Sequence, residues 1–332
     1  MNNPRKENEV LLKVDNFSLD LVTENGNLPV IQDISFQIHQ GEFLALVGES
    51  GCGKSVCSLA LTKLLPSNLA KYKSGSILFQ EEDIIQMDAS EIQNLRGNKI
   101  SYVFQEPFSS LNPLKKIKDQ IIESFLIHKM GTKEEAIHKA EILLEKVGIT
   151  DISQRLNSYP NHMSGGMLQR ISIAMALITD PILLIADEPT SAIDVTIQAQ
   201  LIQLLMEMKK QFSLSVLFIS HDIALVSHMA DRIAVMYAGQ IVEIGKIDEV
   251  IDSPKHPYTQ ALLNSYPSSD DINKELEVIP GIVPSPLEYP IGCHFAERCK
   301  HKMDVCISRK PKSRHITETH SALCHLLEAG LT

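Results

Sequence analysis

A glycine-rich segment near the N-terminus has the residue types needed to bind phosphate. It fits the pattern G-x-x-x-x-G-K-[ST] and consists of Gly48, Glu49, Ser50, Gly51, Cys52, Gly53, Lys54 and Ser55. Glycines let backbone N–H groups close around phosphate oxygens, Lys54 can reach the β- and γ-phosphates, and Ser55 can bind Mg²⁺. The alternative is a glycine-rich turn that matches by chance, which the apolar strand before it and the helix after it disfavour. We interpret Cys52 and Cys57 as packing residues.

Two neighbouring acids form the second candidate for chemistry. Asp187 and Glu188 follow the apolar run from Ile182 to Ala186. An acid at the carboxyl end of a buried strand can face a nucleotide on a phosphate loop, so Asp187 is predicted to hold Mg²⁺. Glu188 is predicted to polarise the attacking water, because phosphoryl transfer depends on positioning and charge stabilisation. The alternative is an ordinary solvated strand end.

These residues need buried strands and adjacent helices to position them. Residues 10–40 alternate apolar and polar side chains, which predicts antiparallel strands that turn at Glu24–Asn27. Buried strands are predicted at 43–47, 182–186 and 216–220, with a hairpin at 233–244 that turns at Ala238-Gly239. A helix is predicted from the glycine-rich loop through Leu65-Pro66. Strands that alternate with helices indicate an α/β fold with a largely parallel core sheet.

The middle of the chain is predicted to be helical, over about residues 108–180. Thr132 and Glu135 form a capping box, and Gly148 ends the helix that follows. Prolines accumulate after residue 254, and long periodic segments stop there. We therefore place a domain boundary at 254, with a C-terminal extension over 255–332.

Composition limits the classes of protein that the chain can represent. It has 332 residues, 44% of them hydrophobic, and a net charge of −10, which disfavours binding of nucleic acid through phosphate contacts. No apolar run reaches the length of a membrane span, and the N-terminus lacks the apolar core of a secretion signal. We expect a cytoplasmic protein whose membrane role, if it has one, comes through partners.

Four cysteines lie in the C-terminal extension, with the spacing C-x5-C-x6-C-x17-C. They are Cys293, Cys299, Cys306 and Cys324. In a reducing compartment such a group suggests a metal site more than disulfides, but the spacing is wider than the tight pairs of zinc ribbons or ferredoxins. Spacing alone leaves scattered free thiols as an equal alternative, and the histidines nearby are further possible ligands.

A series of motifs along the chain resembles those of the ABC-type ATPases. Besides the two above, Ser164, Gly165, Gly166 and Met167 resemble the ABC signature, Gln105 the Q-loop, Asp194 the D-loop, and His221 the switch histidine. The resemblance implies a P-loop ATPase fold with a RecA-like mixed-sheet core, an antiparallel β subdomain and a helical subdomain. It implies that two such domains enclose two ATP molecules, so that the signature acts on the ATP of the partner. Gln105 would bind the Mg²⁺, and His221 would contact the γ-phosphate.

The sequence departs from the family pattern at a few positions. Met163 and Met167 stand where leucine and glutamine are usual, and methionine at the latter position is familiar in the peptide-importer branch. The aromatic residue that stacks on adenine is missing, and Leu21 or Val30 falls near its place. Stacking contributes about 0.5–1.5 kcal/mol, so base binding is expected to be looser than phosphate binding.

The C-terminal extension resembles that of the oligopeptide, dipeptide and nickel permease ATPases. The segments that carry the resemblance are His256-Pro257-Tyr258-Thr259 and Gly292–Cys299. In that branch four cysteines here can hold a [4Fe–4S] cluster, so the resemblance implies a cluster, with zinc as the second choice.

The resemblance also implies a function and a set of partners. We expect an ATP-hydrolysing subunit that powers import of dipeptides or oligopeptides and lies on the cytoplasmic face of the membrane. Its expected partners are a paralogous ATPase subunit (a heterodimer, with a homodimer as the alternative), two transmembrane permease subunits and an extracytoplasmic substrate-binding protein. Alternatives are a nickel or metallophore importer, a non-transport ABC ATPase acting on nucleic acid or ribosomes, and a subunit that binds ATP without cleaving it.

Overall fold

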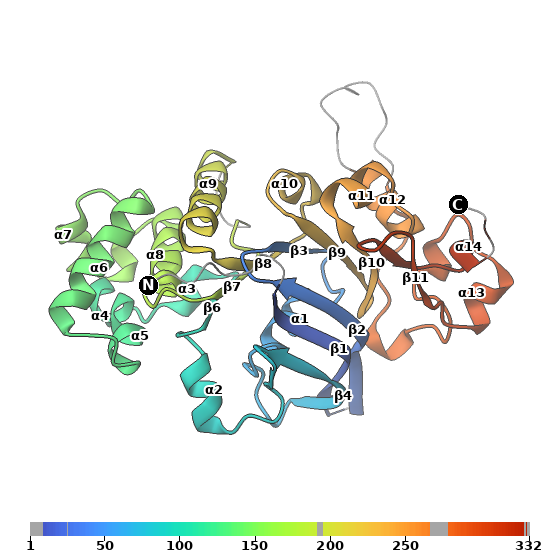
Figure 1. Cartoon of the computed structure of the whole chain (residues 1–332), viewed down its shortest axis with the longest axis horizontal. Coiled ribbons are helices and arrows are strands. Elements are labelled where there is room, and N and C mark those ends of the chain that lie inside the picture. The colour runs from blue at the N-terminus through green and yellow to red at the C-terminus, as the bar shows by residue number, and fades with distance from the viewer. Residues whose placement is uncertain (1–8, 25, 191–194, 266–277, 329, 331–332) are drawn as a thin grey trace. The chain divides into compact units, whose positions relative to one another are not determined.

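The computed structural model describes residues 9–24, 26–190, 195–265, 278–328 and 330 (Figure 1). The chain forms two compact units that each combine separate stretches of sequence. Unit 1 contains Met1–Glu9, His39–Glu42 and Gln86–Ile219, and unit 2 contains Val10–Ile38, Phe43–Ile85 and Ser220–Thr332. The glycine-rich segment and the C-terminal extension therefore belong to the same unit.

One sheet of unit 2 comes from the N-terminal part of the chain. Its strands are β1 (Val10–Thr23), β2 (Gly26–His39), β4 (Ala70–Phe79) and β5 (Glu82–Asp83), in the order β2-β1-β4-β5 (Figure 1). The two strands predicted within 10–40 are confirmed as neighbours. We did not predict β4, which pairs antiparallel with β1, because Lys71, Lys73 and the Ser74–Ser76 stretch interrupt its apolar alternation.

A second set of strands in unit 2 carries the glycine-rich segment. Strand β3 (Phe43–Val47) is completely buried and runs parallel to β9 (Arg232–Tyr237). The predicted hairpin is confirmed, since β9 pairs antiparallel with β10 (Gln240–Lys246). Beyond β10 lie β12 (Ser321–Leu323) and β11 (Ser313–His315), both antiparallel. The C-terminal extension therefore continues the sheet whose strand β3 leads into the glycine-rich segment.

The helices of unit 2 are short. They are α1 (Lys54–Ala60), α10 (Ile223–Ser227), α11 (Ile247–Asp252), α12 (Pro257–Asn264), α13 (Asp304–Ser308) and α14 (His325–Glu328), with 3-10 turns at Pro286–Glu288 and Ala296–Arg298. The prediction that α1 continues through Leu65-Pro66 is wrong. Lys63 takes a left-handed conformation with φ of +50°, and Pro66 has no N–H to donate to a helix, so the helix ends at Ala60.

Unit 1 contains three parallel strands in the order β8-β7-β6. They are β6 (Ile100–Val103), β7 (Leu183–Asp187) and β8 (Ser215–Ser220). All residues of β7 and β8 are buried, as expected for parallel strands covered on both faces. The predicted strands at 182–186 and 216–220 are confirmed with shifts of one residue.

The rest of unit 1 is helical. Its helices are α2 (Ala89–Leu95), α3 (Pro107–Ser110), α4 (Ile117–Ile121), α5 (Glu123–Ile127), α6 (Lys133–Lys146), α7 (Ile152–Leu156), α8 (Gly165–Leu177) and α9 (Val195–Phe212), with a 3-10 turn at Pro160–His162. The capping box of α6 is confirmed: the Thr132 hydroxyl accepts from the Glu135 N–H, and the Glu135 side chain accepts from the Thr132 N–H. Figure 1 shows α4, α6 and α8 grouped together, and both α4 and α6 contact α8.

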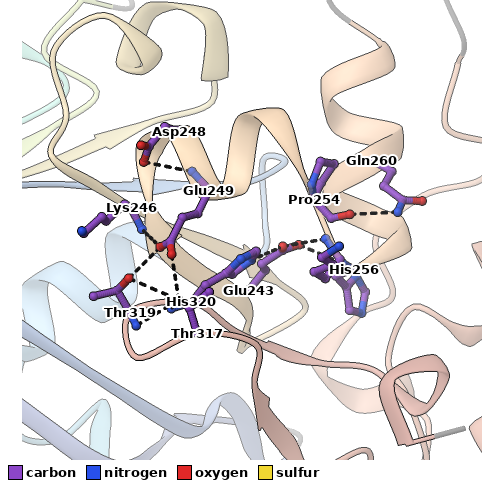
Figure 2. A network of polar contacts seen from close by, with 11 residues as sticks. Glu243, Lys246, Asp248, Glu249, Pro254, His256, Gln260, Thr317, Thr319 and His320 are labelled. Atoms are coloured by element: carbon purple, nitrogen blue, oxygen red, sulfur yellow. Dashed lines mark hydrogen bonds and ion pairs between the residues drawn. The ribbon is translucent and has the colours of Figure 1, made fainter. Parts of the chain in front are cut away.

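A buried carboxylate ties the C-terminal extension to β10. Glu243, with 1% of its surface exposed, accepts hydrogen bonds from the backbone N–H groups of Lys255 (2.7 Å) and His256 (2.8 Å). His320 also contacts it through Nε2 at 2.7 Å (Figure 2). Because a buried charge is tolerated only when it is paired and hydrogen-bonded, these contacts fix the start of α12 and the β12 segment to one point.

The pH dependence of stability is predicted from His256, whose side chain caps α12. Its Nδ1 accepts from the Tyr258 N–H at 3.0 Å, and burial lowers its pKa from 6.5 to about 4. Between these pH values the unfolded chain binds a proton that the folded chain does not, so stability falls as pH falls through this window, by about 3 kcal/mol in all. Urea unfolding of wild type and His256→Asn, which keeps a capping oxygen, should show a shallower pH slope for the variant. Equal slopes would contradict this assignment.

Candidate functional site

The glycine-rich segment forms a tight loop between β3 and α1. A Cβ atom added to Gly48 would lie 2.1 Å from the carbonyl oxygen of Met236, so only glycine fits there without moving the backbone of β9. Gly53 has φ of +106°, a conformation that L side chains rarely adopt. Ser50 and Gly51 at the tip of the loop are exposed, as a phosphate-binding position requires.

Lys54 lies inside this loop. Its side chain is 5% exposed, and Nζ donates to the carbonyl oxygens of Gly48 (2.8 Å) and Glu49 (3.0 Å). The ammonium group thus holds the loop in a curved form and lies beside the backbone that is predicted to surround the phosphates. Ser55 is half-buried at the start of α1. Cys52 and Cys57 are both buried, consistent with a packing role.

Part of the C-terminal extension packs against this loop, which we did not predict. The Tyr258 hydroxyl accepts from the Glu49 N–H at 2.9 Å. The Tyr258 ring packs against Tyr237 and Phe295, with centroid distances of 4.6 and 5.4 Å. Arg298 reaches the Glu49 side chain. Sequence spacing gives no signal for these contacts, because more than 200 positions separate Glu49 from Tyr258 and from Arg298.

The acid pair lies in unit 1 at the end of β7. Asp187 is 4% exposed, and its Oδ2 accepts from the Tyr102 hydroxyl at 3.0 Å. Carboxylate oxygens are preferred ligands of Mg²⁺, and the tyrosine fixes the orientation of this carboxylate. Glu188 has φ of +43°, which is rare for a residue with a side chain and is a mark of functional positions. Its Oε2 accepts from Gln105 Nε2 at 3.0 Å, so two predicted site residues are brought together.

Removal of the Tyr102 hydroxyl is expected to weaken metal binding. Hydrogen-bonding partners of metal ligands typically contribute about tenfold or more to metal affinity. Tyr102→Phe should therefore raise the Mg²⁺ concentration for half-maximal ATP hydrolysis by about tenfold. Ser101→Ala serves as a control on the preceding, buried residue of the same strand. Identical Mg²⁺ titrations for Tyr102→Phe and wild type would show that Asp187 does not depend on Tyr102.

The signature segment forms the start of α8, a 13-residue helix of unit 1. Ser164 is exposed and is the N-cap of α8, where its hydroxyl accepts from the Met167 N–H at 3.3 Å. Gly165 and Gly166 are half-buried in the first turn, and so is Met167. Exposed N–H groups and the helix dipole at such a start favour an anion.

The remaining predicted residues are placed as follows. His221 is exposed directly after β8 and is assigned to unit 2. Val30 is buried, and its backbone carbonyl lies next to Gly53, which places it beside the phosphate loop. Leu21 is half-buried and pairs with Ala70 across β1 and β4. Asp194 lies outside the described residues.

The four cysteines of the extension come into one neighbourhood. Burial and the nearby thiols of Cys306, Cys324 and Cys299 raise the pKa of Cys293 to about 12, against the effect of the Phe295 N–H. Burial likewise raises the pKa of Cys324 to about 11, opposed by the backbone N–H groups of Leu326 and Leu327. Backbone N–H groups near the sulfurs suit thiolate ligands. Yet no three His, Cys, Asp or Glu side chains among the described residues are arranged to hold a metal ion, so the quartet is not a ready site in this conformation.

Comparison with known proteins decides the family. The family model described as "ABC transporter" matches residues 31–191, and "Oligopeptide/dipeptide transporter, C-terminal region" matches 242–306. The oligopeptide transport ATP-binding protein OppD of Bacillus subtilis (strain 168) is 44% identical over 96% of this chain and 89% of its own length. This chain belongs to the ABC transporter ATP-binding proteins. The dipeptide transport ATP-binding protein DppD of the same strain is 43% identical over 96% of this ABC protein and 95% of its own length.

Solved structures agree with this assignment. The dimeric ABC transporter cassette MJ0796 superposes with a TM-score of 0.65 and 26% identity, covering 71% of this ABC protein and 98% of the cassette. The same cassette has been solved in a post-hydrolysis state bound to ADP and phosphate. The fold predicted from the motifs, an ABC-type P-loop ATPase, is therefore confirmed, and the chain is an ATPase that converts ATP and water to ADP and phosphate.

Within the part of the chain that the structure describes, none of the helices combines the length and the apolar character that crossing a bilayer requires.

Proposed function

We propose that this ABC ATPase powers the import of dipeptides or oligopeptides across the cytoplasmic membrane. The observation that carries the proposal is the C-terminal region, which matches the oligopeptide/dipeptide transporter family in addition to the cassette itself. Relatives named as oligopeptide and dipeptide transport ATP-binding proteins, similar over nearly the whole chain, support it. The protein would lie on the cytoplasmic face of the membrane, bound to its partners.

The proposed assembly contains ATPase subunits, permease subunits and a binding protein. This chain would pair with a paralogous ATPase subunit or a second copy, and each ATPase would dock on one transmembrane permease subunit. An extracytoplasmic binding protein would deliver the peptide. The dimeric cassette that resembles this chain supports the pairing. Because the phosphate loop and the signature of one chain act on different nucleotides in this arrangement, one copy does not complete an active site.

Each residue of the motifs has a proposed role in this assembly. The backbone of residues 48–55, with Lys54, would bind the triphosphate, while Ser55, Asp187 and Gln105 would hold Mg²⁺. Glu188 would polarise the attacking water, held in place by its hydrogen bond to Gln105. His221 would contact the γ-phosphate. Ser164, Gly165, Gly166 and Met167 would close on the ATP of the partner, next to Asp194 of the D-loop.

Uptake measurements test the cargo. A deletion strain carrying the wild-type gene should accumulate labelled di- and oligopeptides, whereas the same strain with Glu188→Gln should not. Nickel accumulation should be equal in the two strains. If the Glu188→Gln strain loses nickel uptake but keeps peptide uptake, the nickel or metallophore alternative is favoured. Affinity purification of the tagged chain without any integral-membrane partner would favour the non-transport class.

We further propose that Cys293, Cys299, Cys306 and Cys324 hold a [4Fe–4S] cluster, with zinc as the second choice. Burial and the neighbouring thiols raise the pKa of Cys293, Cys299 and Cys324, and a backbone N–H group lies near each of these three sulfurs, which supports this proposal. Their side chains have to reorient, since in this conformation they are not arranged to hold a metal ion. Iron, sulfide and zinc analysis of anaerobically purified protein distinguishes the options, with Cys306→Ser as the matched variant. A folded, colourless, metal-free wild type would contradict both.

A further inference from the structure

A buried arginine of the C-terminal extension binds a residue of the phosphate loop. Arg298 ends the 3-10 turn Ala296–Arg298 and contacts Glu49, the second residue of the glycine-rich segment. One terminal nitrogen of the guanidinium donates to Oε1 and the other to Oε2, each at 3.1 Å. Two parallel bonds between a guanidinium and a carboxylate fix both distance and orientation. The pair joins positions 249 residues apart in the sequence.

Further contacts hold the Arg298 side chain in this conformation. The residue is 9% exposed, and its Nε donates to the carbonyl oxygen of Pro280 at 2.8 Å. A terminal nitrogen also donates to the Tyr237 hydroxyl at 3.3 Å. The guanidinium lies 5.7 Å from the Tyr237 ring centroid and 6.0 Å from that of Phe295, within cation–π range. These contacts hold the positive charge of Arg298 at a fixed position next to the loop.

Glu49 is held at three points, of which Arg298 provides one. Its N–H donates to the Tyr258 hydroxyl, and its carbonyl oxygen accepts from Lys54 Nζ. Its side chain accepts both bonds from Arg298. The extension therefore fixes the backbone that holds Lys54, through two residues that lie outside the glycine-rich motif.

The charge of Glu49 gives Arg298 a second effect on the loop. A carboxylate on a loop that binds a triphosphate opposes the negatively charged ligand, and in a half-buried position this repulsion is poorly screened. Arg298 neutralises it. Loss of Arg298 would leave an unpaired carboxylate on the residue whose carbonyl oxygen binds the Lys54 ammonium group.

We propose that Arg298 is a positioning residue for ATP: it neutralises and fixes Glu49, and so the C-terminal extension sets the nucleotide affinity of the phosphate loop. This inference rests on the proposed role of residues 48–55 in binding phosphate. It gives the extension a part in the ATPase cycle besides any metal that its cysteines hold. Another arginine of the same extension, Arg309, pairs instead with Glu328 at 2.6 Å.

The test compares variants of the full-length chain by equilibrium binding of a fluorescent ATP analogue. Arg298→Gln should weaken binding about tenfold, as expected when a charge-assisted hydrogen bond is lost. Glu49→Gln combined with Arg298→Gln should recover most of that loss, because the opposing carboxylate is gone. Arg309→Gln, the matched control, should bind as wild type does. A purely structural role for Arg298 predicts no recovery in the double variant.

Steady-state hydrolysis by the assembled transporter provides a second readout. Arg298→Gln should raise KM for ATP and leave kcat nearly unchanged, the pattern of lost ground-state binding. If Arg298→Gln does not fold, Arg298→Lys replaces it. The lysine keeps the charge without the fork, so its affinity should lie between those of wild type and the expected tenfold loss.

The outcomes separate this inference from the assignment on which it rests. Wild-type affinity in Arg298→Gln or Arg298→Lys, or a double variant no better than Arg298→Gln, overturns the inference if Lys54→Ala has lost ATP binding in the same assay. If Lys54→Ala binds ATP as wild type does, the phosphate-loop assignment itself is wrong, and the inference is overturned with it.

Discussion

Replacement of Glu188 by glutamine is expected to trap ATP and nearly stop its hydrolysis. A general base that is positioned on the attacking water contributes about 10²–10⁴ in rate, so turnover should fall by at least about 100-fold. Binding should persist, because glutamine has the same shape and its amide oxygen can still accept the hydrogen bond from Gln105 that Glu188 accepts at 3.0 Å. The left-handed conformation of the residue should also be kept, because it belongs to the backbone.

Two measurements establish this result. Phosphate release reports turnover, and retention of labelled ATP after gel filtration reports trapping. Glu207→Gln is the control: it removes the same charge from an exposed position on α9 of the same unit and should leave both measurements unchanged. Turnover in Glu188→Gln equal to that of wild type would remove Glu188 from its assigned role. Low turnover with no trapped ATP would indicate damage to the nucleotide site instead.

Local rules predict most of the framework that carries the site. The buried strands β3, β7 and β8 follow from short apolar runs, and the start of α6 follows from Thr132 and Glu135, because each signal lies within a few residues. The glycine-rich segment is predicted from the spacing of its glycines. Gly48 must be glycine because a Cβ atom there would clash with the backbone carbonyl of Met236 in β9. In these segments local propensity and tertiary structure agree.

Contacts made by distant residues could not be predicted in this way. Nothing near Glu49 indicates that Arg298 and Tyr258 hold it, since such pairing depends on how β10 and β12 join the extension to the sheet. Tyr102, which orients Asp187, sits in a strand whose alternation identifies buried positions but not hydrogen-bond partners. Strand β4 was missed because its polar residues face solvent along much of its length. Each of these contacts and strands depends on how segments far apart in the sequence pack together.

Removal of the Lys54 side chain is expected to abolish ATP binding. Its ammonium group donates to two carbonyl oxygens of the loop, and in the proposed complex it would also contact the β- and γ-phosphates. Lys54→Ala loses the charge for the phosphates together with the bonds that curve the loop, so affinity should fall by about 100-fold or more. Lys71→Ala, on an exposed position of β4 in the same unit, is the matched control. Because Arg298 and Lys54 hold opposite ends of Glu49, weakening of ATP binding by both variants, with Lys54→Ala the more severe, would indicate that the extension and the loop act as one nucleotide-binding element.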